Sequence, residues 1–120
     1  MSGKDVFQHQ SITGIVIHGK KEARQLGFPT ANIRCSPELY NRIPEGIYGS
    51  LCWVLGQHHS SISYVRDSLI EVHLIDKDMN LYGQQIIVSL TKFIREPIPY
   101  TTAEAMRLQI KKDIREIIEN

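Results

Sequence analysis

The sequence predicts a mainly β protein, a small antiparallel barrel covered by one C-terminal α-helix, and three observations support this prediction. Short runs rich in β-branched and aromatic residues follow one another closely and are separated by turn residues. A helical pattern of apolar residues occurs once, at the C-terminal end. So many strands would leave exposed edges in an open sheet, and closure into a barrel removes those edges.

The first strands are expected in the N-terminal half of the chain. The stretch SITGIVIHG, residues 11–19, is rich in β-branched residues, and a long basic loop follows it. A second strand is expected over residues 46–56. The polar stretch GQHHSS at residues 56–61 is turn-like, a short strand is expected at residues 61–65, and residues 66–68 form a tight connection.

The run LIEVHLI, residues 69–75, has a clear period of two. Its isoleucine, valine and leucine side chains at positions 70, 72 and 74 are expected on one face, while Glu71 and His73 lie on the other. A turn region ends at Gly83, and a long strand is expected at residues 84–94. The two prolines that follow prevent regular structure before the last segment.

The last segment predicts an amphipathic helix. Thr101 and Glu104 fit a capping box, with the threonine as N-cap and the glutamate at the third helical position. We interpret the apolar stripe that follows as core packing rather than a cofactor site. This stripe consists of Met106, Ile110, Ile114 and Ile117. The expected solvent side consists of Lys111, Lys112, Asp113, Arg115 and Glu116.

Composition limits the classes of function. The chain has 120 residues, which suits a single domain spanning residues 1–120. Its formal net charge is +1, so no strong field favours nucleic acid, and no apolar run is long enough for a membrane span. Two separated cysteines and a polar N-terminus without a signal-peptide pattern predict a cytoplasmic protein with reduced thiols.

A basic, glycine-containing loop follows the first strand and is a candidate phosphate site. Glycines let the backbone approach a ligand, lysines and arginine can hold phosphates, and a threonine hydroxyl can bind Mg²⁺ beside a phosphate. The spacing matches neither a Walker loop nor a dinucleotide-binding motif, so a solvated surface loop stays open as the alternative. The residues concerned are Gly19, Lys20, Lys21, Arg24, Gly27, Pro29, Thr30 and Asn32.

Glu71 is a candidate catalytic residue because it lies within a strand of mostly apolar residues. A carboxylate in such a position is costly unless it is paired, exposed or functional. If this face lines a cavity, Glu71 can act as a general base on a substrate hydroxyl; if it faces solvent, it has no such role. We interpret His73 as structural, and the adjacent His58 and His59 as exposed loop residues without a third metal ligand.

Four stretches, in order, resemble the riboflavin kinase family. GIVIHGKKEARQLGFPTANI, residues 14–33, resembles the first motif of that family, and its Gly-Phe-Pro-Thr-Ala-Asn block is highly specific. PEGIYG at residues 44–49 and IEVHLIDKDMNLYGQQI at residues 70–86 resemble the next two segments. FIREPIPYTTAEAMRLQIKKDI, residues 93–114, resembles the family's ending. The resemblance therefore covers nearly the whole chain.

The resemblance implies a fold and an activity. The fold of the family is a six-stranded Greek-key β-barrel with a C-terminal helix, which agrees with the pattern of the strands. The implied reaction moves the γ-phosphate of ATP to the 5′-hydroxyl of riboflavin and gives FMN and ADP, with Mg²⁺ or Zn²⁺. ATP and riboflavin would be the small-molecule partners of a monomer.

The resemblance also implies roles for individual residues. Thr30 and Asn32 would bind the metal and the ATP phosphates, and Glu71 would be the general base. The ATP flap would consist of Gly19, Lys20, Lys21 and Arg24, and Gly27 and Pro29 would belong to the turn that aims the metal ligands. The residues expected near the isoalloxazine ring are Phe93, Ile94, Arg95, Gln109 and Asp113.

The sequence departs from the family at three places. Ala23 stands where glycine is usual, and Lys77 stands where an aromatic residue is common. The segment between Tyr48 and Glu71 is short: SISYV and a three-residue connection replace an Asn-Ile-Gly strand and a Pro-Thr-Phe loop. These departures give an alternative function, a barrel that binds a flavin, a nucleotide or a protein partner without turnover.

Overall fold

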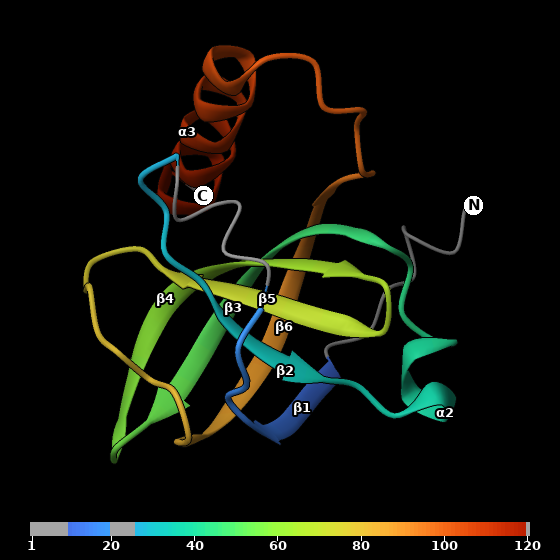
Figure 1. Ribbon diagram of the computed structural model, residues 1–120, viewed down its shortest axis with the longest axis vertical. Helices are drawn as coiled ribbons and strands as arrows, with labels where there is room; N and C mark the ends of the chain where they lie inside the picture. Colours follow the sequence, from blue (N-terminus) through green and yellow to red (C-terminus); the bar gives the residue numbers. More distant parts are fainter. Residues whose placement is uncertain (1–9, 20–25, 120) are drawn as a thin grey trace.

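Six antiparallel strands form one sheet in the order β1-β6-β3-β4-β5-β2, and a C-terminal helix lies against the outside of the sheet (Figure 1). This computed structural model describes residues 10–19 and 26–119. The strands are β1 (Gln10–Ile15), β2 (Ala31–Arg34), β3 (Gly46–Val54), β4 (Gln57–Arg66), β5 (Leu69–Leu74) and β6 (Gln85–Arg95). The helices are α2 (Pro37–Tyr40) and α3 (Ala103–Glu119). The predicted mainly β fold with a C-terminal helix is confirmed.

The two end strands of the sheet approach each other and nearly close the barrel. Just after β1, the backbone N–H of Ile17 donates to the carbonyl of Asn32 in β2 at 2.8 Å. Gly14 lies so close to β2 that a Cβ atom there would be 3.0 Å from Cβ of Ile33. The sheet therefore curls until its two end strands lie side by side and are joined by one backbone bridge, in agreement with the predicted barrel.

The barrel interior is packed with aliphatic side chains and contains one polar cluster. Ile70, Val72 and Leu74 of β5 are buried inside, which confirms the predicted alternation. The Ser50 hydroxyl is within hydrogen-bond distance of those of Ser61, at 2.6 Å, and Ser63, at 2.7 Å. These mutual bonds offset the cost of burying hydroxyl groups.

The third and fourth strands form a longer hairpin than expected. The predicted polar turn at residues 56–61 is wrong except at Gly56, because β4 begins at Gln57 and pairs with β3. The turn lies at Leu55 and Gly56, both with positive φ, which suits a two-residue hairpin. His58 and His59 are therefore strand residues, and the His58 ring lies against Trp53 across the hairpin. The first residues of β4 are polar and mostly exposed, so no apolar alternation in the sequence marks them as a strand.

The helix α3 also differs from the prediction at two places. Its N-cap is Thr102, not Thr101: the Thr102 hydroxyl accepts from the N–H of Ala105 at 3.0 Å. Glu104 pairs instead with Arg107 at 2.8 Å, one turn along the helix. Asp113 was expected on the solvent side, but it is only 2% exposed. It lies seven residues after Met106 and so falls on the stripe that faces the barrel.

Candidate active site

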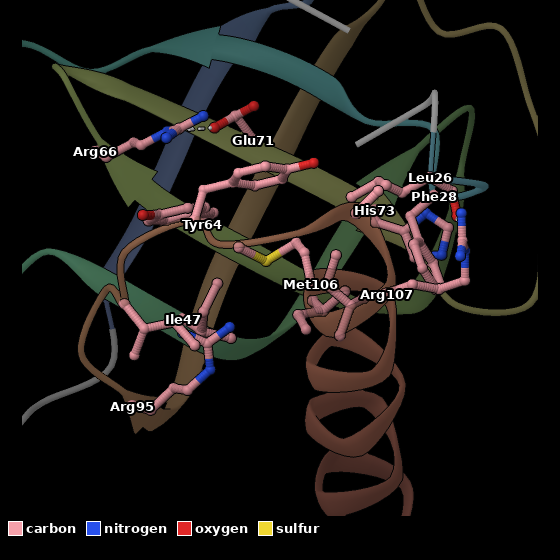
Figure 2. Close-up of a pocket in the computed structure, with 15 residues that line it drawn as sticks. Leu26, Phe28, Ile47, Tyr64, Arg66, Glu71, His73, Arg95, Met106 and Arg107 are labelled. Atoms are coloured by element: carbon pink, nitrogen blue, oxygen red, sulfur yellow. Dashed lines mark hydrogen bonds and ion pairs between the residues drawn. The ribbon is translucent and has the colours of Figure 1, made fainter. Parts of the chain in front are cut away.

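A cavity of about 610 Å³ lies between the outer face of strands β3, β4 and β5 and the helix α3. Its strand side includes Ile62, Tyr64, Glu71 and His73, and its helix side includes Met106. Figure 2 shows Tyr64, Glu71 and His73 on the sheet and Met106 on the helix around this space. The face of β5 that carries Glu71 therefore lines a cavity and does not simply meet solvent. This resolves the alternative that the sequence left open.

Three residues of neighbouring strands form a row on this outer face. Glu71 of β5 is the register partner of Asn32 in β2 on one side and of Tyr64 in β4 on the other. Side chains directly opposite in antiparallel strands point to the same face, with Cβ atoms about 5 Å apart. The sheet register thus places the predicted general base beside the predicted metal ligand.

A second cavity of about 350 Å³ lies next to the first, on the β2 side of this row. It is lined by polar groups of the predicted ATP loop, among them Thr30 and Asn32. The rings of His18 and Tyr82 are stacked at its rim, 3.8 Å apart. Lys20, Lys21, Ala23 and Arg24 lie outside the described residues.

The Asn32 side chain has the features of a ligand for a cation. It is 3% exposed, and its Oδ1 has no hydrogen-bond partner among the described residues. Its Nδ2 lies 3.5 Å from the Thr30 hydroxyl. Hard oxygen donors of this kind suit Mg²⁺, which keeps few protein ligands and shares the others with phosphates. The described residues hold no cluster of three or more His, Cys, Asp and Glu side chains for a metal, so Thr30 and Asn32 would act together with the nucleotide.

Gly19 leaves room for this amide. A Cβ atom at Gly19 would lie 2.3 Å from Nδ2 of Asn32 and 3.0 Å from its Oδ1. No side chain fits at that distance unless the amide moves. The glycine of the predicted flap therefore has a definite steric reason in the structure.

The Gly-Phe-Pro turn is tied to β5 by His73. Gly27 has a φ of 93°, a conformation that favours glycine. The Nδ1–H of His73 donates to the carbonyl of Pro29 at 2.8 Å, and the ring of Phe28 packs edge-on against the same imidazole. These contacts support the interpretation of His73 as structural, and they fix the backbone immediately before Thr30.

The residues expected near a flavin ring have different surroundings. Arg95 lines the first cavity, and its guanidinium donates to the buried carboxylate of Asp113, from Nε at 3.1 Å to Oδ1 and 3.0 Å to Oδ2, and from Nη2 at 2.8 Å to Oδ2. Gln109 donates to Oδ1 of the same carboxylate at 2.9 Å, and neither Gln109 nor Asp113 lines the cavity. Phe93 packs edge-on against Tyr48. The half-buried Ile94 is not part of the cavity wall.

Tyr64 and Arg66 are among the polar residues of the cavity that sequence reasoning missed. The Arg66 Nε–H donates to Oε2 of Glu71 at 3.1 Å, and the Arg66 guanidinium lies over the Tyr64 ring at 4.7 Å. The signal was present in the period of two: residues 62, 64 and 66 share the face of β4 that points away from the barrel interior. The sequence did not show that this face pairs with the face of Glu71.

A comparison with protein families shows to which family this chain belongs. The riboflavin kinase family model matches residues 7–120. The chain belongs to the riboflavin kinase family. The resemblance of the four sequence stretches is therefore confirmed.

Individual relatives agree with this membership. The chain is 37% identical over 118 residues to the bifunctional riboflavin kinase/FMN adenylyltransferase of Buchnera aphidicola subsp. Schizaphis graminum, with 87% of this chain and 36% of that protein covered. It is 33% identical over 112 residues to the RNA-binding riboflavin kinase RibR of Bacillus subtilis, with 86% and 47% covered. The crystal structure of riboflavin kinase from Trypanosoma brucei shares the fold, with a TM-score of 0.71 and 19% identity over 95% of this chain and 78% of that one.

The chain spans about a third to a half of the length of these two curated relatives. Within the part of the chain that the structure describes, neither helix has the length and apolar character that a membrane crossing requires.

Proposed function

We propose that this domain transfers the γ-phosphate of ATP to the 5′-hydroxyl of riboflavin and forms FMN and ADP. The observation that carries the proposal is that Glu71 lines the larger cavity, while its register partner Asn32 lines the smaller one. A donor bound in one cavity and an acceptor in the other would meet at a general base and a cation ligand. Phosphoryl transfer depends mainly on such positioning and on neutralisation of charge.

The two cavities differ in the chemistry that they offer. Apolar and aromatic side chains such as Ile62, Tyr64 and Met106 line the larger cavity, which suits a flat isoalloxazine ring. The smaller cavity contains Thr30 and Asn32 and the backbone of Gly19, which suits a nucleotide with its phosphates. We therefore assign riboflavin to the larger cavity and ATP to the smaller one.

In the proposed reaction the Glu71 carboxylate accepts the proton of the 5′-hydroxyl. That oxygen forms a bond to the γ-phosphorus, the bond from the γ-phosphorus to the bridging oxygen breaks, and ADP leaves. Thr30 and Asn32 would hold Mg²⁺, or Zn²⁺, which when bound neutralises charge on the phosphates. The donor set contains only oxygen, and this favours Mg²⁺ over Zn²⁺.

The remaining partner assignments are proposals of the same kind. We propose a cytoplasmic monomer that acts on small molecules and not on nucleic acid. The formal net charge of +1 supports this, because nucleic-acid binding draws most of its affinity from neutralised phosphates. The relative named as RNA-binding extends well beyond the matched segment, which covers 47% of that protein's length.

The test is direct formation of FMN. Purified protein is incubated with riboflavin, ATP and Mg²⁺, then with Zn²⁺, and FMN is separated by chromatography. We expect FMN in proportion to the protein, and a loss of about 100- to 10,000-fold in kcat for Glu71→Gln, the usual contribution of general base catalysis. Folded protein that binds riboflavin but forms no FMN would contradict the proposal and support the alternative of a barrel without turnover.

A further inference from the structure

The shortened connection between β4 and β5 brings a cation to the general base. Arg66 is the last residue of β4, and its Nε–H donates to Oε2 of Glu71 at 3.1 Å, as Figure 2 shows. The Glu71 side chain is 11% exposed and that of Arg66 is 32% exposed. The pair thus lies at the rim of the larger cavity, where the carboxylate is largely removed from solvent.

The Arg66 side chain is held by the Tyr64 ring and by the Glu71 carboxylate. Its guanidinium lies over the ring of Tyr64, two residues earlier on the same face of β4, at 4.7 Å. Stacking on an aromatic face fixes the plane of a guanidinium and adds attraction. Because Tyr64 is the register partner of Glu71, the stack delivers the donor directly to the carboxylate.

The two-residue hairpin that follows Arg66 is also fixed. Asp67 and Ser68 have φ values of 54° and 62°, as a tight hairpin of this twist requires. The N–H of Asp67 donates to the Glu45 carboxylate at 3.3 Å, and the carbonyl of Ser68 accepts from the N–H of Cys35 at 3.0 Å. Tyr40 of α2 donates to the same Glu45 carboxylate. The end of β4 therefore presents Arg66 from a rigid support.

We propose that Arg66 is a positioning residue for Glu71 in the transfer of phosphate to riboflavin, an inference that rests on the proposed function. The arginine engages Oε2 and fixes the plane of the carboxylate, and Oε1 is then the oxygen that receives the hydroxyl proton. Among the described residues, the other two arginines of this cavity have different partners: Arg95 binds Asp113, and Arg107 binds Glu104. Of the cavity arginines that the structure describes, Arg66 is the one whose side chain donates to Glu71.

The test compares steady-state kinetics of the wild type with those of Arg66→Ala, Arg66→Lys, Glu71→Gln and the double variant Arg66→Ala/Glu71→Gln. Misplacement of a reacting group by a small distance can cost about 100-fold in rate. We expect Arg66→Ala to lower kcat about 10- to 100-fold, with KM for riboflavin and ATP within about twofold. Arg66→Lys should keep part of the rate, because it retains the charge but not the stacked fork.

The double variant separates positioning from a general effect on the fold. If Arg66 acts through Glu71, Arg66→Ala should lower kcat by less than about twofold when Glu71 is already glutamine. Arg115→Ala, on the exposed side of α3, is the matched control for loss of an arginine and should keep wild-type kinetics. Circular dichroism on each variant identifies any that fail to fold, and Arg66→Lys then carries the comparison.

The outcomes are distinct. An active wild type with an unchanged kcat in Arg66→Ala would overturn the positioning role and leave the proposed function intact. A raised KM for ATP at constant kcat would also overturn it, because it would assign Arg66 to nucleotide binding. An equal loss of kcat on Arg66→Ala in the wild-type and Glu71→Gln backgrounds would also overturn the positioning role. A folded wild type that forms no FMN would instead overturn the proposed function, and the positioning role with it.

Discussion

The two faces of strand β5 serve different purposes although they alternate residue by residue. The inner face consists of Ile70, Val72 and Leu74, which are at most 5% exposed and contribute to the barrel core. The outer face carries Glu71 and His73, each held by a polar contact beside a cavity. The period of two that builds the core thus also places the chemistry, and the cover provided by α3 turns the outer face into a site. Substitutions of adjacent residues should therefore separate stability from activity.

The largest expected effect is a loss of stability when a side chain on the inner face of β5 is truncated. Ile70→Ala truncates a fully buried side chain that lines neither cavity and should lower the free energy of unfolding by about 3 kcal/mol. Its kcat for FMN formation should change little at a temperature where the variant is folded. The matched control, Glu71→Gln, should keep the unfolding free energy within about 1 kcal/mol and lose turnover. Urea titration and the chromatographic assay measure both quantities, and a stability loss in Glu71→Gln larger than in Ile70→Ala would contradict this division.

A substitution at Gly19, beside the proposed metal ligand Asn32, also tests whether activity can be lost without a loss of stability. Gly19→Ala places a Cβ 2.3 Å from the Asn32 amide, which can rotate away because it is the end of a side chain. We expect about a 10- to 100-fold loss of kcat/KM for Mg·ATP with little change in stability.

The matched control for Gly19→Ala is Gly56→Ala in the β3–β4 hairpin, where no atom lies within 4 Å and φ is +78°. This variant should show the reverse pattern, with about 1 kcal/mol lost in stability and no loss of activity. Wild-type kinetics in Gly19→Ala would show that the Asn32 amide has no part in nucleotide binding.

The smallest expected effect concerns an ionisable group of the barrel interior. Burial raises the pKa of the Cys52 thiol from 9.0 to about 11. The unfolded chain therefore loses this proton at a lower pH than the folded protein, so stability falls as the pH rises from about 9 to 11. The slope is about 1.4 kcal/mol per pH unit for one thiol.

Unfolding at pH 8, 9 and 10 in wild type and Cys52→Ala would measure this slope. The variant should lose less stability with pH, although the buried Tyr48, whose pKa burial also raises, keeps part of the fall. Identical slopes would show that Cys52 does not titrate differently in the folded and unfolded chains.

Local pattern predicted much of the fold because the core follows a simple period. The alternation of residues 69–75 predicted the strand β5 and its buried side correctly. The stripe of Met106 and Ile110 predicted the helix α3, but its interpretation as core packing was wrong, because both side chains line the larger cavity and lie outside the core cluster. The polar start of β4 was mistaken for a turn, because exposed strand residues do not alternate between apolar and polar. The strand β2 and the helix α2 were not predicted, since four residues are too few for a period to show.

The site depended on contacts that no single segment shows. The proximity of Asn32 to Glu71 follows from the pairing of β2 with β5, across nearly 40 residues of chain. Asp113 was assigned to the solvent side because it is charged, yet its partner Arg95 comes from β6. The spacing from Met106 would have revealed it. To predict that Arg66 contacts Glu71, one would need both the register of β4 with β5 and the length of the hairpin that joins them.

Amide chemical shifts test whether the two substrate cavities meet at the Asn32–Glu71 pair. Riboflavin and Mg·ADP are titrated separately into ¹⁵N-labelled protein. Riboflavin should shift the amides of Tyr64 and Met106, Mg·ADP those of Thr30 and Leu81, and both ligands those of Asn32 and Glu71. If both ligands shift only the residues of one cavity, or if neither shifts Asn32 and Glu71, the claim is wrong.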